Sequence, residues 1–397
     1  MAPVPTNTRW STAAQIAAAV NAGEVSASAV IDAALARIAR LNPSLNAFTA
    51  VTAERARAKA RALDATRDKK KLPLAGVPFA VKNLFDVEGL ATVAGSKINR
   101  AHPPAERDAT LIEWLEAAGA VLVGTLNMGE YAYDFTGENV HDGPSRNPHD
   151  LTRMSGGSSG GSGSAVGGGM VPLALGSDTN GSIRVPSSLC GIFGLKPTYG
   201  RLSRARTFPF VVSLDHLGPF ARSTRDLAIS YDAMQGTDST DPAHADRAPE
   251  PATPQLLRGF DGLRIVVAGG YFKKGASPEA LEALSRVATA VGAKDEIEIP
   301  EAARAIHQVD MCRDATSLET SACSYRHDLR QVDVHRHPPK AEGVGAATMF
   351  IVSSACAMRS AISSRQGAAM ICTPIGKGLS GTGTATTGSP MKEIGCV

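Results

Sequence analysis

Hydrophobic residues in the first 82 positions follow two different spacings. Up to residue 65 they recur every three or four positions, which predicts helices, and a continuous apolar run then precedes Lys82. The predicted helices cover residues 11–22, 28–41 and 52–65, with Gly23 and Asn42-Pro43 expected to end the first two. The run Leu74–Val81 is short and contains β-branched and aromatic residues, so it predicts a buried strand with Lys82 at its end.

The same two patterns alternate further along the chain. Predicted helices cover residues 109–118, 223–235 and 277–292, and predicted strands cover residues 120–124, 171–176 and 263–268. Helices that alternate with buried strands predict an α/β layered fold. The segment 237–258 is rich in Asp, Pro and Ala, so we expect it to be a surface connection.

Composition narrows the class of protein without selecting a function. The chain has 397 residues, of which 43% are hydrophobic and 20% charged, as in ordinary globular proteins. The 41 basic and 38 acidic residues nearly balance, giving a formal net charge of +3. This charge is too small to indicate binding to nucleic acid or to an anionic membrane surface. The N-terminus lacks the basic and apolar segments of a secretory signal, and no run of about 20 apolar residues predicts a membrane span. We therefore expect a cytoplasmic protein.

A Gly/Ser-rich segment, residues 155–169, is the first candidate for chemistry. On composition alone it is more typical of a flexible linker, and it lacks the lysine of a phosphate-binding loop. The segment that follows is more informative. Its turn Thr179-Asn180-Gly181-Ser182 consists of small residues, which can direct successive backbone N–H groups toward one point, as an oxyanion requires.

A serine nucleophile in this turn needs a base. The histidines nearest in sequence, His149 and His216, are more typical of surface or structural residues. The alternative is a neutral lysine. Lys82 follows an apolar strand, where removal from water would lower its pKa and favour the free amine. Taken alone, a lysine at the end of a strand is more often a surface residue.

Three sequence blocks resemble the amidase signature family. The first is Gly156-Gly157-Ser158-Ser159-Gly160-Gly161-Ser162, the second is Gly176 to Arg184, and the third is Gly191-Ile192-Phe193-Gly194-Leu195-Lys196-Pro197-Thr198. Lys82 stands in Ala80-Val81-Lys82-Asn83, where the family has its catalytic lysine, and Ser182 lies 24 residues after Ser158. The resemblance implies a Lys82–Ser158–Ser182 triad on a mixed central sheet flanked by helices.

The resemblance also implies a mechanism for amide hydrolysis. Neutral Lys82 accepts a proton from Ser158, which takes one from the nucleophile Ser182, and the backbone N–H groups of Thr179, Asn180, Gly181 and Ser182 hold the oxyanion. It further implies a cis Gly157–Ser158 peptide bond. For Asp178 and Arg184 it implies a structural ion pair that braces the loop. No cofactor or metal is implied.

The blocks at 83–98 and 128–148, with Asn180, are similar to 1-carboxybiuret hydrolases, and the A-type subunits of tRNA amidotransferases share the main blocks. The resemblance therefore implies a small amide or urea-like substrate and, as partners, a homodimer or a small accessory subunit, with no direct nucleic-acid contact. A glutamine-hydrolysing component of a tRNA amidotransferase and a truncated, inactive member of the family remain alternatives. A Gly-rich phosphate-binding module is a further alternative, which the absence of a basic residue in the loop disfavours.

The resemblance ends near residue 306. Residues 307–397 show no sustained helix or strand period and contain five of the six cysteines. We interpret residues 1–306 as an incomplete amidase-signature domain and residues 307–397 as an aberrant or disordered tail, from a frameshift or from divergence; the abrupt loss of pattern favours the frameshift. A zinc site in this tail is a third interpretation, but no CxxC or HxxxH pair supports it.

This interpretation of the tail predicts its response to protease. Limited proteolysis should cleave rapidly after residue 306 and leave a resistant core of about 300 residues, because an unpacked terminus is accessible to protease. Mass spectrometry of the fragments measures the cleavage positions. If the tail resists cleavage as well as the core does, the frameshift interpretation is wrong.

Overall fold

The computed structural model describes residues 8–66, 72–259, 263–299, 348–351 and 370–371. The chain divides into two compact units, the first with residues Met1–Gly259 and Ala369–Val397 and the second with residues Phe260–Ala368. The boundary predicted at residue 306 and nearly all of the predicted tail lie outside the described residues and stay predictions.

Helices and strands alternate along the described chain. The α-helices are α1 (Ala13–Ala22), α2 (Ala27–Leu45), α3 (Ala53–Ala65), α4 (Thr110–Ala117), α5 (Gly160–Gly167), α6 (Arg184–Leu189), α7 (Thr224–Ala233) and α8 (Pro278–Ala290). The strands are β1 (Phe48–Val51), β2 (Pro78–Lys82), β3 (Val121–Leu126), β4 (Leu173–Asp178), β5 (Phe193–Lys196), β6 (His216–Ala221), β7 (Arg264–Ala268), β8 (Asp295–Ile297), β9 (Thr348–Ile351) and β10 (Met370–Ile371). No helix in the described ranges is long and apolar enough to span a membrane.

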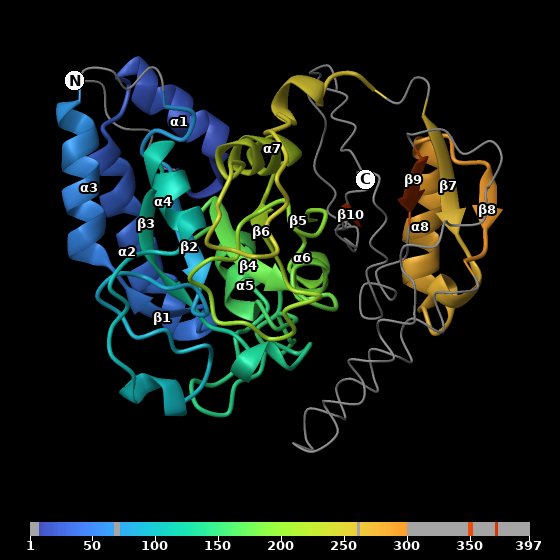
Figure 1. The fold of residues 1–397 in the computed structure, drawn as a ribbon, viewed down its shortest axis with the longest axis horizontal. Coiled ribbons are helices and arrows are strands. Elements are labelled where there is room, and N and C mark those ends of the chain that lie inside the picture. Colours follow the sequence, from blue (N-terminus) through green and yellow to red (C-terminus); the bar gives the residue numbers. More distant parts are fainter. Residues whose placement is uncertain (1–7, 67–71, 260–262, 300–347, 352–369, 372–397) are drawn as a thin grey trace, which may run out of the picture. The chain divides into compact units, whose positions relative to one another are not determined.

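The first unit contains a seven-stranded mixed sheet in the order β1-β3-β2-β4-β6-β5-β10 (Figure 1). Strand β2 is parallel to both neighbours, β3 and β4, whereas β1, β6, β5 and β10 join the sheet by antiparallel pairing. The predicted α/β fold with a mixed central sheet is confirmed. Both flanks of β2 are covered by other strands, so the end of β2 lies in the middle of the sheet.

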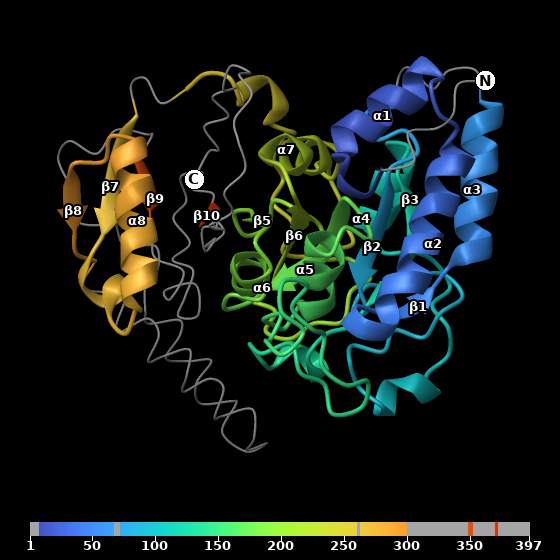
Figure 2. The same ribbon diagram turned by 180° about the vertical axis from the view of Figure 1, so that it is seen from behind.

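Helix α5 contacts the central strands β2, β3, β4 and β6, and Figure 2 shows it on the near side, between β6 and β2. It is formed by the Gly/Ser-rich segment, whose composition alone is typical of a linker, and every one of its residues is buried. The linker interpretation of this segment is therefore wrong, because the segment forms a buried helix. Glycine permits the close contact, because a Cβ atom at Gly161 would lie 2.5 Å from the carbonyl oxygen of Ala47 and 2.6 Å from the backbone nitrogen of Asn127.

The helices and strands expected in the first 82 residues are present with shifted ends. Helix α1 ends at Ala22, and the predicted stop Gly23 follows it with a left-handed φ of 75°. The predicted end of the second helix at Asn42-Pro43 is wrong, because α2 continues through Pro43 to Leu45. The Asn46 N–H bonds the Asn42 carbonyl oxygen at 2.7 Å and so closes a final turn around the proline.

Five elements of the first unit, β1, β5, β6, β10 and α6, were not predicted, and α5 stands where composition alone favoured a linker. Strands β1 and β5 have four residues each, too few for a periodic pattern to develop. Strand β6 contains Gly218 and Pro219, which ordinarily indicate a turn.

The second unit has a three-stranded parallel sheet in the order β8-β7-β9, together with helix α8. Strand β7 and helix α8 match the predicted strand 263–268 and helix 277–292. Helix α8 begins after Ser277, whose hydroxyl accepts the Ala280 N–H at 3.3 Å.

Candidate active site

Lys82 is the last residue of β2, and its side chain is completely buried. Its Nζ lies 2.7 Å from Ser158 Oγ and 2.9 Å from Ser177 Oγ. Burial lowers the pKa of Lys82 to about 7, against the opposing charges of Asp134, Asp178 and Asp215. A substantial fraction of the lysine is therefore the free amine near neutral pH.

Ser158 lies between the segment after β3 and the start of α5. The peptide bond Gly157–Ser158 is cis, as the family resemblance implied. The Ser158 carbonyl oxygen accepts the Gly129 N–H at 3.1 Å, and the Gly157 N–H donates to the Phe135 carbonyl oxygen at 2.8 Å. These backbone bonds fix the hydroxyl of Ser158 relative to Lys82.

Ser182 belongs to the turn between β4 and α6, and a buried ion pair holds this turn. Arg184 Nη2 lies 2.7 Å from Asp178 Oδ1, and neither side chain is exposed. The same carboxylate accepts the N–H groups of Gly181 at 2.7 Å and Ile183 at 3.1 Å. Burial alone would raise the pKa of Asp178, but the Arg184 guanidinium outweighs it and holds that pKa well below its usual range.

The four predicted oxyanion donors are not equivalent. Gly181 does not offer its N–H in this structure, because that group donates to Asp178. Within the described residues, no acceptor is bonded to the backbone N–H groups of Asn180 and Ser182. Thr179 is anchored by its hydroxyl, which donates to Asp215 Oδ1 at 2.5 Å. The backbone N–H of Thr179 also has no acceptor among these residues, so Thr179, Asn180 and Ser182 are the three members of the set that are open to a ligand.

Of the two steps in the predicted proton path, only the one between Lys82 and Ser158 is hydrogen-bonded among the described residues. Lys82 and Ser158 are in contact, whereas within the described part of the chain no hydrogen bond joins the hydroxyls of Ser158 and Ser182. The histidines have structural contacts. His149 Nε2 lies 2.9 Å from the Cys190 carbonyl oxygen, and His216 Nδ1 lies 2.6 Å from that of Leu214.

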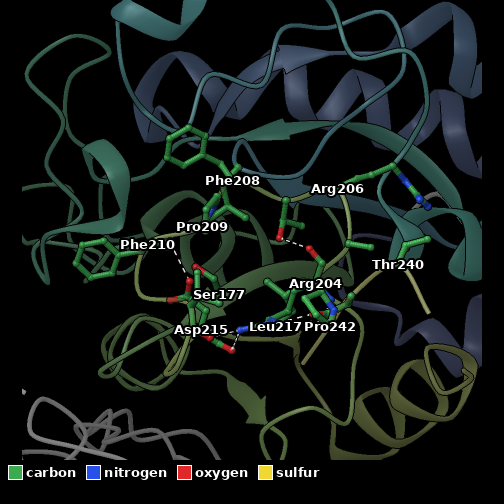
Figure 3. A pocket seen from close by; sticks show the side chains of 15 residues that line it. Ser177, Arg204, Arg206, Phe208, Pro209, Phe210, Asp215, Leu217, Thr240 and Pro242 are labelled. Carbon is green, nitrogen blue, oxygen red and sulfur yellow. Dashed lines mark hydrogen bonds and ion pairs between the residues drawn. The ribbon is translucent and has the colours of Figure 1, made fainter. Parts of the chain in front are cut away.

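A cavity of about 240 Å³ borders the site at Ser177 (Figure 3). Much of its wall is apolar, including Phe208, Pro209, Phe210 and Leu217. Ser177 was missed as a functional candidate, although it stands in the second motif block. Its signal was a hydroxyl at the end of β4, beside the strand that carries Lys82.

Two arginines border this cavity, and both are already paired. Arg204 forms an ion pair with Asp241 at 3.2 Å, and Arg206 forms one with Glu113 at 2.9 Å. Asp215, which also borders the cavity, accepts backbone N–H groups from Phe210 and Val211. The positive charges of the wall are thus largely compensated.

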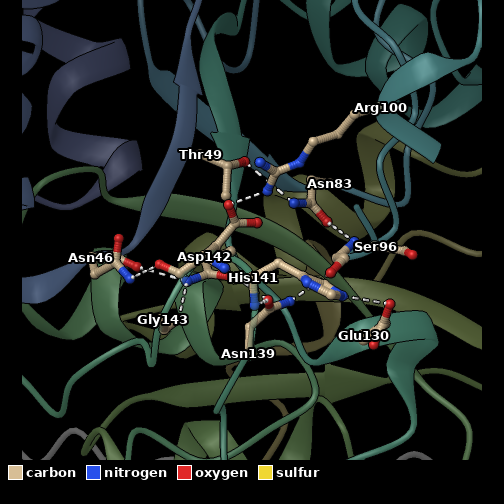
Figure 4. A network of polar contacts seen from close by, with 12 residues as sticks. Asn46, Thr49, Asn83, Ser96, Arg100, Glu130, Asn139, His141, Asp142 and Gly143 are labelled. Carbon is tan, nitrogen blue, oxygen red and sulfur yellow. Dashed lines mark hydrogen bonds and ion pairs between the residues drawn. The ribbon is translucent and has the colours of Figure 1, made fainter. Parts of the chain in front are cut away.

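A polar network holds the segment that follows Lys82 against the loop that follows β3 (Figure 4). Asn83 Oδ1 accepts the Gly95 N–H at 3.0 Å, and Asn139 Nδ2 donates to the carbonyl oxygens of Gly95 at 2.7 Å and Met128 at 2.8 Å. These bonds join the end of β2 to the loop whose Gly129 holds Ser158.

The described residues contain no group of three His, Cys, Asp or Glu side chains that could hold a metal ion. The cysteines and histidines that the zinc interpretation used all lie outside the described residues, so that interpretation stays untested.

The amidase family profile matches residues 29–355. The chain is 56% identical over 290 residues to AtzE of Pseudomonas sp. (strain ADP), a 1-carboxybiuret hydrolase subunit, covering 72% of this chain and 64% of that protein. It is 43% identical over 294 residues to the A-type subunit of glutamyl-tRNA(Gln) amidotransferase from Halorhodospira halophila, covering 73% of this chain and 60% of that protein. It therefore spans less than two thirds of the length of these relatives.

Solved structures with the same fold agree with the sequence matches. One comes from a study of a vestigial protein complex that reveals the evolutionary origins of an s-triazine catabolic enzyme, with a TM-score of 0.72, 55% identity and coverage of 73% of this chain and 64% of that one. Another is the native peptide amidase of Stenotrophomonas maltophilia, with a TM-score of 0.69, 32% identity and coverage of 76% and 64%.

The buried pair Asp178–Arg184 should be essential for stability. Arg184→Met should lower the free energy of unfolding by about 3–5 kcal/mol, because it leaves a buried carboxylate unpaired. Denaturant unfolding at pH 8 and pH 5 measures this loss. An ionised, paired Asp178 stabilises the fold above the ordinary carboxyl pKa. In the variant the unpaired Asp178 carboxyl can take up a proton, so the difference in free energy of unfolding between the variant and the unsubstituted protein should be smaller at pH 5 than at pH 8.

The surface pair Arg107–Glu113, in which the Arg107 side chain is 63% exposed, provides the control, and Arg107→Met should cost less than about 1 kcal/mol. The double variant Asp178→Asn, Arg184→Met should recover part of the loss. Equal stability of Arg184→Met and the unsubstituted protein would show that the pair does not hold the turn.

Proposed function

The chain belongs to the amidase family, and from this membership we propose that it is an amidohydrolase that cleaves a C–N amide bond through Lys82, Ser158 and Ser182. The observation that carries the proposal is the 2.7 Å contact between the buried Lys82 Nζ and Ser158 Oγ. A lysine with a pKa of about 7 can act as a general base near neutral pH.

In the proposed reaction, Lys82 takes a proton from Ser158 as Ser158 takes one from Ser182. Ser182 Oγ forms a bond to the amide carbon, whose oxygen becomes negatively charged and accepts the N–H groups of Asn180 and Ser182. As the C–N bond breaks, Ser158 gives its proton to the departing amine and takes one from the Lys82 ammonium, so Lys82 is again neutral. Water then attacks the acyl ester and gives a proton to Ser158 as Ser158 passes one to Lys82. When the ester C–O bond breaks, Ser182 regains its proton from Ser158, which Lys82 reprotonates.

We propose a small amide or urea-like substrate such as 1-carboxybiuret, supported by 56% identity to one component of a 1-carboxybiuret hydrolase. Glutamine hydrolysis is the second candidate, supported by several A-type components of amidotransferases at 42–45% identity. Assay of biuret-type amides, aliphatic and aryl amides and glutamine separates the two. An inactive chain, the third alternative, would hydrolyse none of them.

We further propose a cytoplasmic enzyme that associates as a homodimer or with a small accessory subunit. The accessory subunit is supported by the relative studied within a protein complex. Since the chain spans less than two thirds of that relative, co-purification with candidate small subunits is the appropriate test.

Ser182 is the proposed nucleophile. Ser182→Ala should abolish labelling by a fluorophosphonate probe and reduce amide hydrolysis by at least about 10³-fold, because no acyl-enzyme can form. Peptide mass spectrometry locates the adduct, and the buried Ser188→Ala serves as the matched control. Substantial hydrolysis by folded Ser182→Ala protein would exclude this assignment.

Lys82 is the proposed base and should set the pH dependence. Since its free amine is the active form, the rate of Ser182 labelling should fall about tenfold per pH unit below an apparent pKa of about 7 and level off above it. Lys82→Arg should be unreactive at every pH, because a guanidinium stays charged. The exposed Lys97→Arg is the control, and a reactive Lys82→Arg would contradict the role.

A further inference from the structure

We propose that Ser177 is the hydroxyl through which Lys82 exchanges its proton with the cavity bordered by Phe208, Phe210 and Asp215. The inference rests on the proposed role of Lys82 as a base. It assigns a role to Ser177, which the sequence motifs left without one. It also implies that the cavity takes up the proton that Lys82 releases, in addition to holding a substrate.

The valence of the lysine nitrogen determines what each serine can do. A neutral amine has two N–H groups and one lone pair. If Lys82 is to take a proton from Ser158, its lone pair must face Ser158 Oγ, at 2.7 Å. An N–H group then points to Ser177 Oγ, at 2.9 Å. Ser177 is therefore the acceptor that orients the lone pair toward Ser158.

The hydroxyl proton of Ser177 is available for transfer. In the described part of the chain, Ser177 Oγ accepts from Lys82, but its own O–H donates to no protein acceptor. Ser177 borders the cavity (Figure 3). Because Lys82 itself is completely buried, the hydroxyl of Ser177 provides a connection between the amine and cavity water.

Ser159 holds Ser177 in this position. Ser159 Oγ donates to the Ser177 carbonyl oxygen at 3.2 Å and accepts the Ser177 N–H at 3.4 Å. Glycine at position 176 is required for this contact, since a Cβ atom there would lie 2.7 Å from Ser159 Oγ. The two hydroxyls that contact Lys82 thus have a fixed separation.

The surrounding carboxylates favour the Lys82 ammonium, whereas burial favours the neutral amine, so the lysine can exist in both forms. The carboxylates that act on Lys82 are Asp134 from the loop after β3, Asp178 from β4 and Asp215 from the cavity wall. In the step itself, the Lys82 ammonium gives a proton to Ser177 Oγ while the Ser177 O–H proton passes to a water molecule. The products are a neutral amine, an intact serine hydroxyl and a hydronium ion, so atoms and charge balance.

The test measures proton exchange at Lys82 directly, in the full chain labelled with nitrogen-15 at the lysine Nζ. The Lys82 signal is assigned by its loss in Lys82→Arg. Ser177→Ala should slow exchange of the Lys82 Nζ protons with solvent by about tenfold or more and move its titration to lower pH, because the ammonium loses an acceptor. Ser177→Thr keeps the hydroxyl and should restore both.

Ser162→Ala is the matched control, because this buried serine bonds the Leu175 carbonyl oxygen of β4 at 2.9 Å without contacting Lys82. It should leave exchange and titration unchanged. Unchanged exchange and titration in folded Ser177→Ala, or failure of folded Ser177→Thr to restore them, would overturn the proposal. Fluorophosphonate labelling of the unsubstituted protein tests the proposed function separately, because proton exchange at Lys82 requires no reaction at Ser182.

Discussion

The removal of the Lys82 amine from water is the constraint on which the site depends. An ammonium group buried in a sheet is costly, and the chain meets this cost by lowering the pKa of the group to about 7 rather than by pairing it with a carboxylate. The nearby partners are the neutral hydroxyls of Ser158 and Ser177. A carboxylate in direct contact would keep the lysine charged and remove its basicity.

In the turn that carries Ser182, the buried groups keep their charges, whereas Lys82 can lose its charge. Asp178 and Arg184 are as deeply buried as Lys82, yet they are paired with each other and remain ionised. The same carboxylate collects backbone N–H groups and thereby shapes the turn that presents Ser182. The site therefore combines a neutral buried base with a charged buried brace, and the difference follows from the immediate neighbours of each group.

The sequence predicted most of the long elements and a set of candidate catalytic residues, for different reasons. Helices such as α1 and α8 have caps and periodic apolar residues, which are local signals. Lys82, Ser158 and Ser182 were recognisable only because three motif blocks occur at family spacing. The structure brings Lys82 and Ser158 together, while the catalytic roles remain proposals.

What escaped prediction depends on contacts between distant segments. Composition could not reveal that the Gly/Ser-rich segment forms α5, because the reason for its glycines is the backbone of Ala47 and Asn127. Ser177 escaped for the same reason, since its significance comes from its distance to Lys82. The donation of the Gly181 N–H to Asp178 is likewise a matter of how the turn closes in space.

The two bonds between Ser159 and Ser177 have a mechanical consequence. They tie the start of α5 to the end of β4, so a displacement of either element carries the other with it. The positions of the two hydroxyl oxygens that contact the lysine are thereby coupled to each other. Phe208 and Phe210 reach the cavity from another segment, the connection between β5 and β6, which takes no part in these two bonds. The hydroxyls that contact the lysine and the aromatic rings that would face a guest molecule therefore belong to separate parts of the chain.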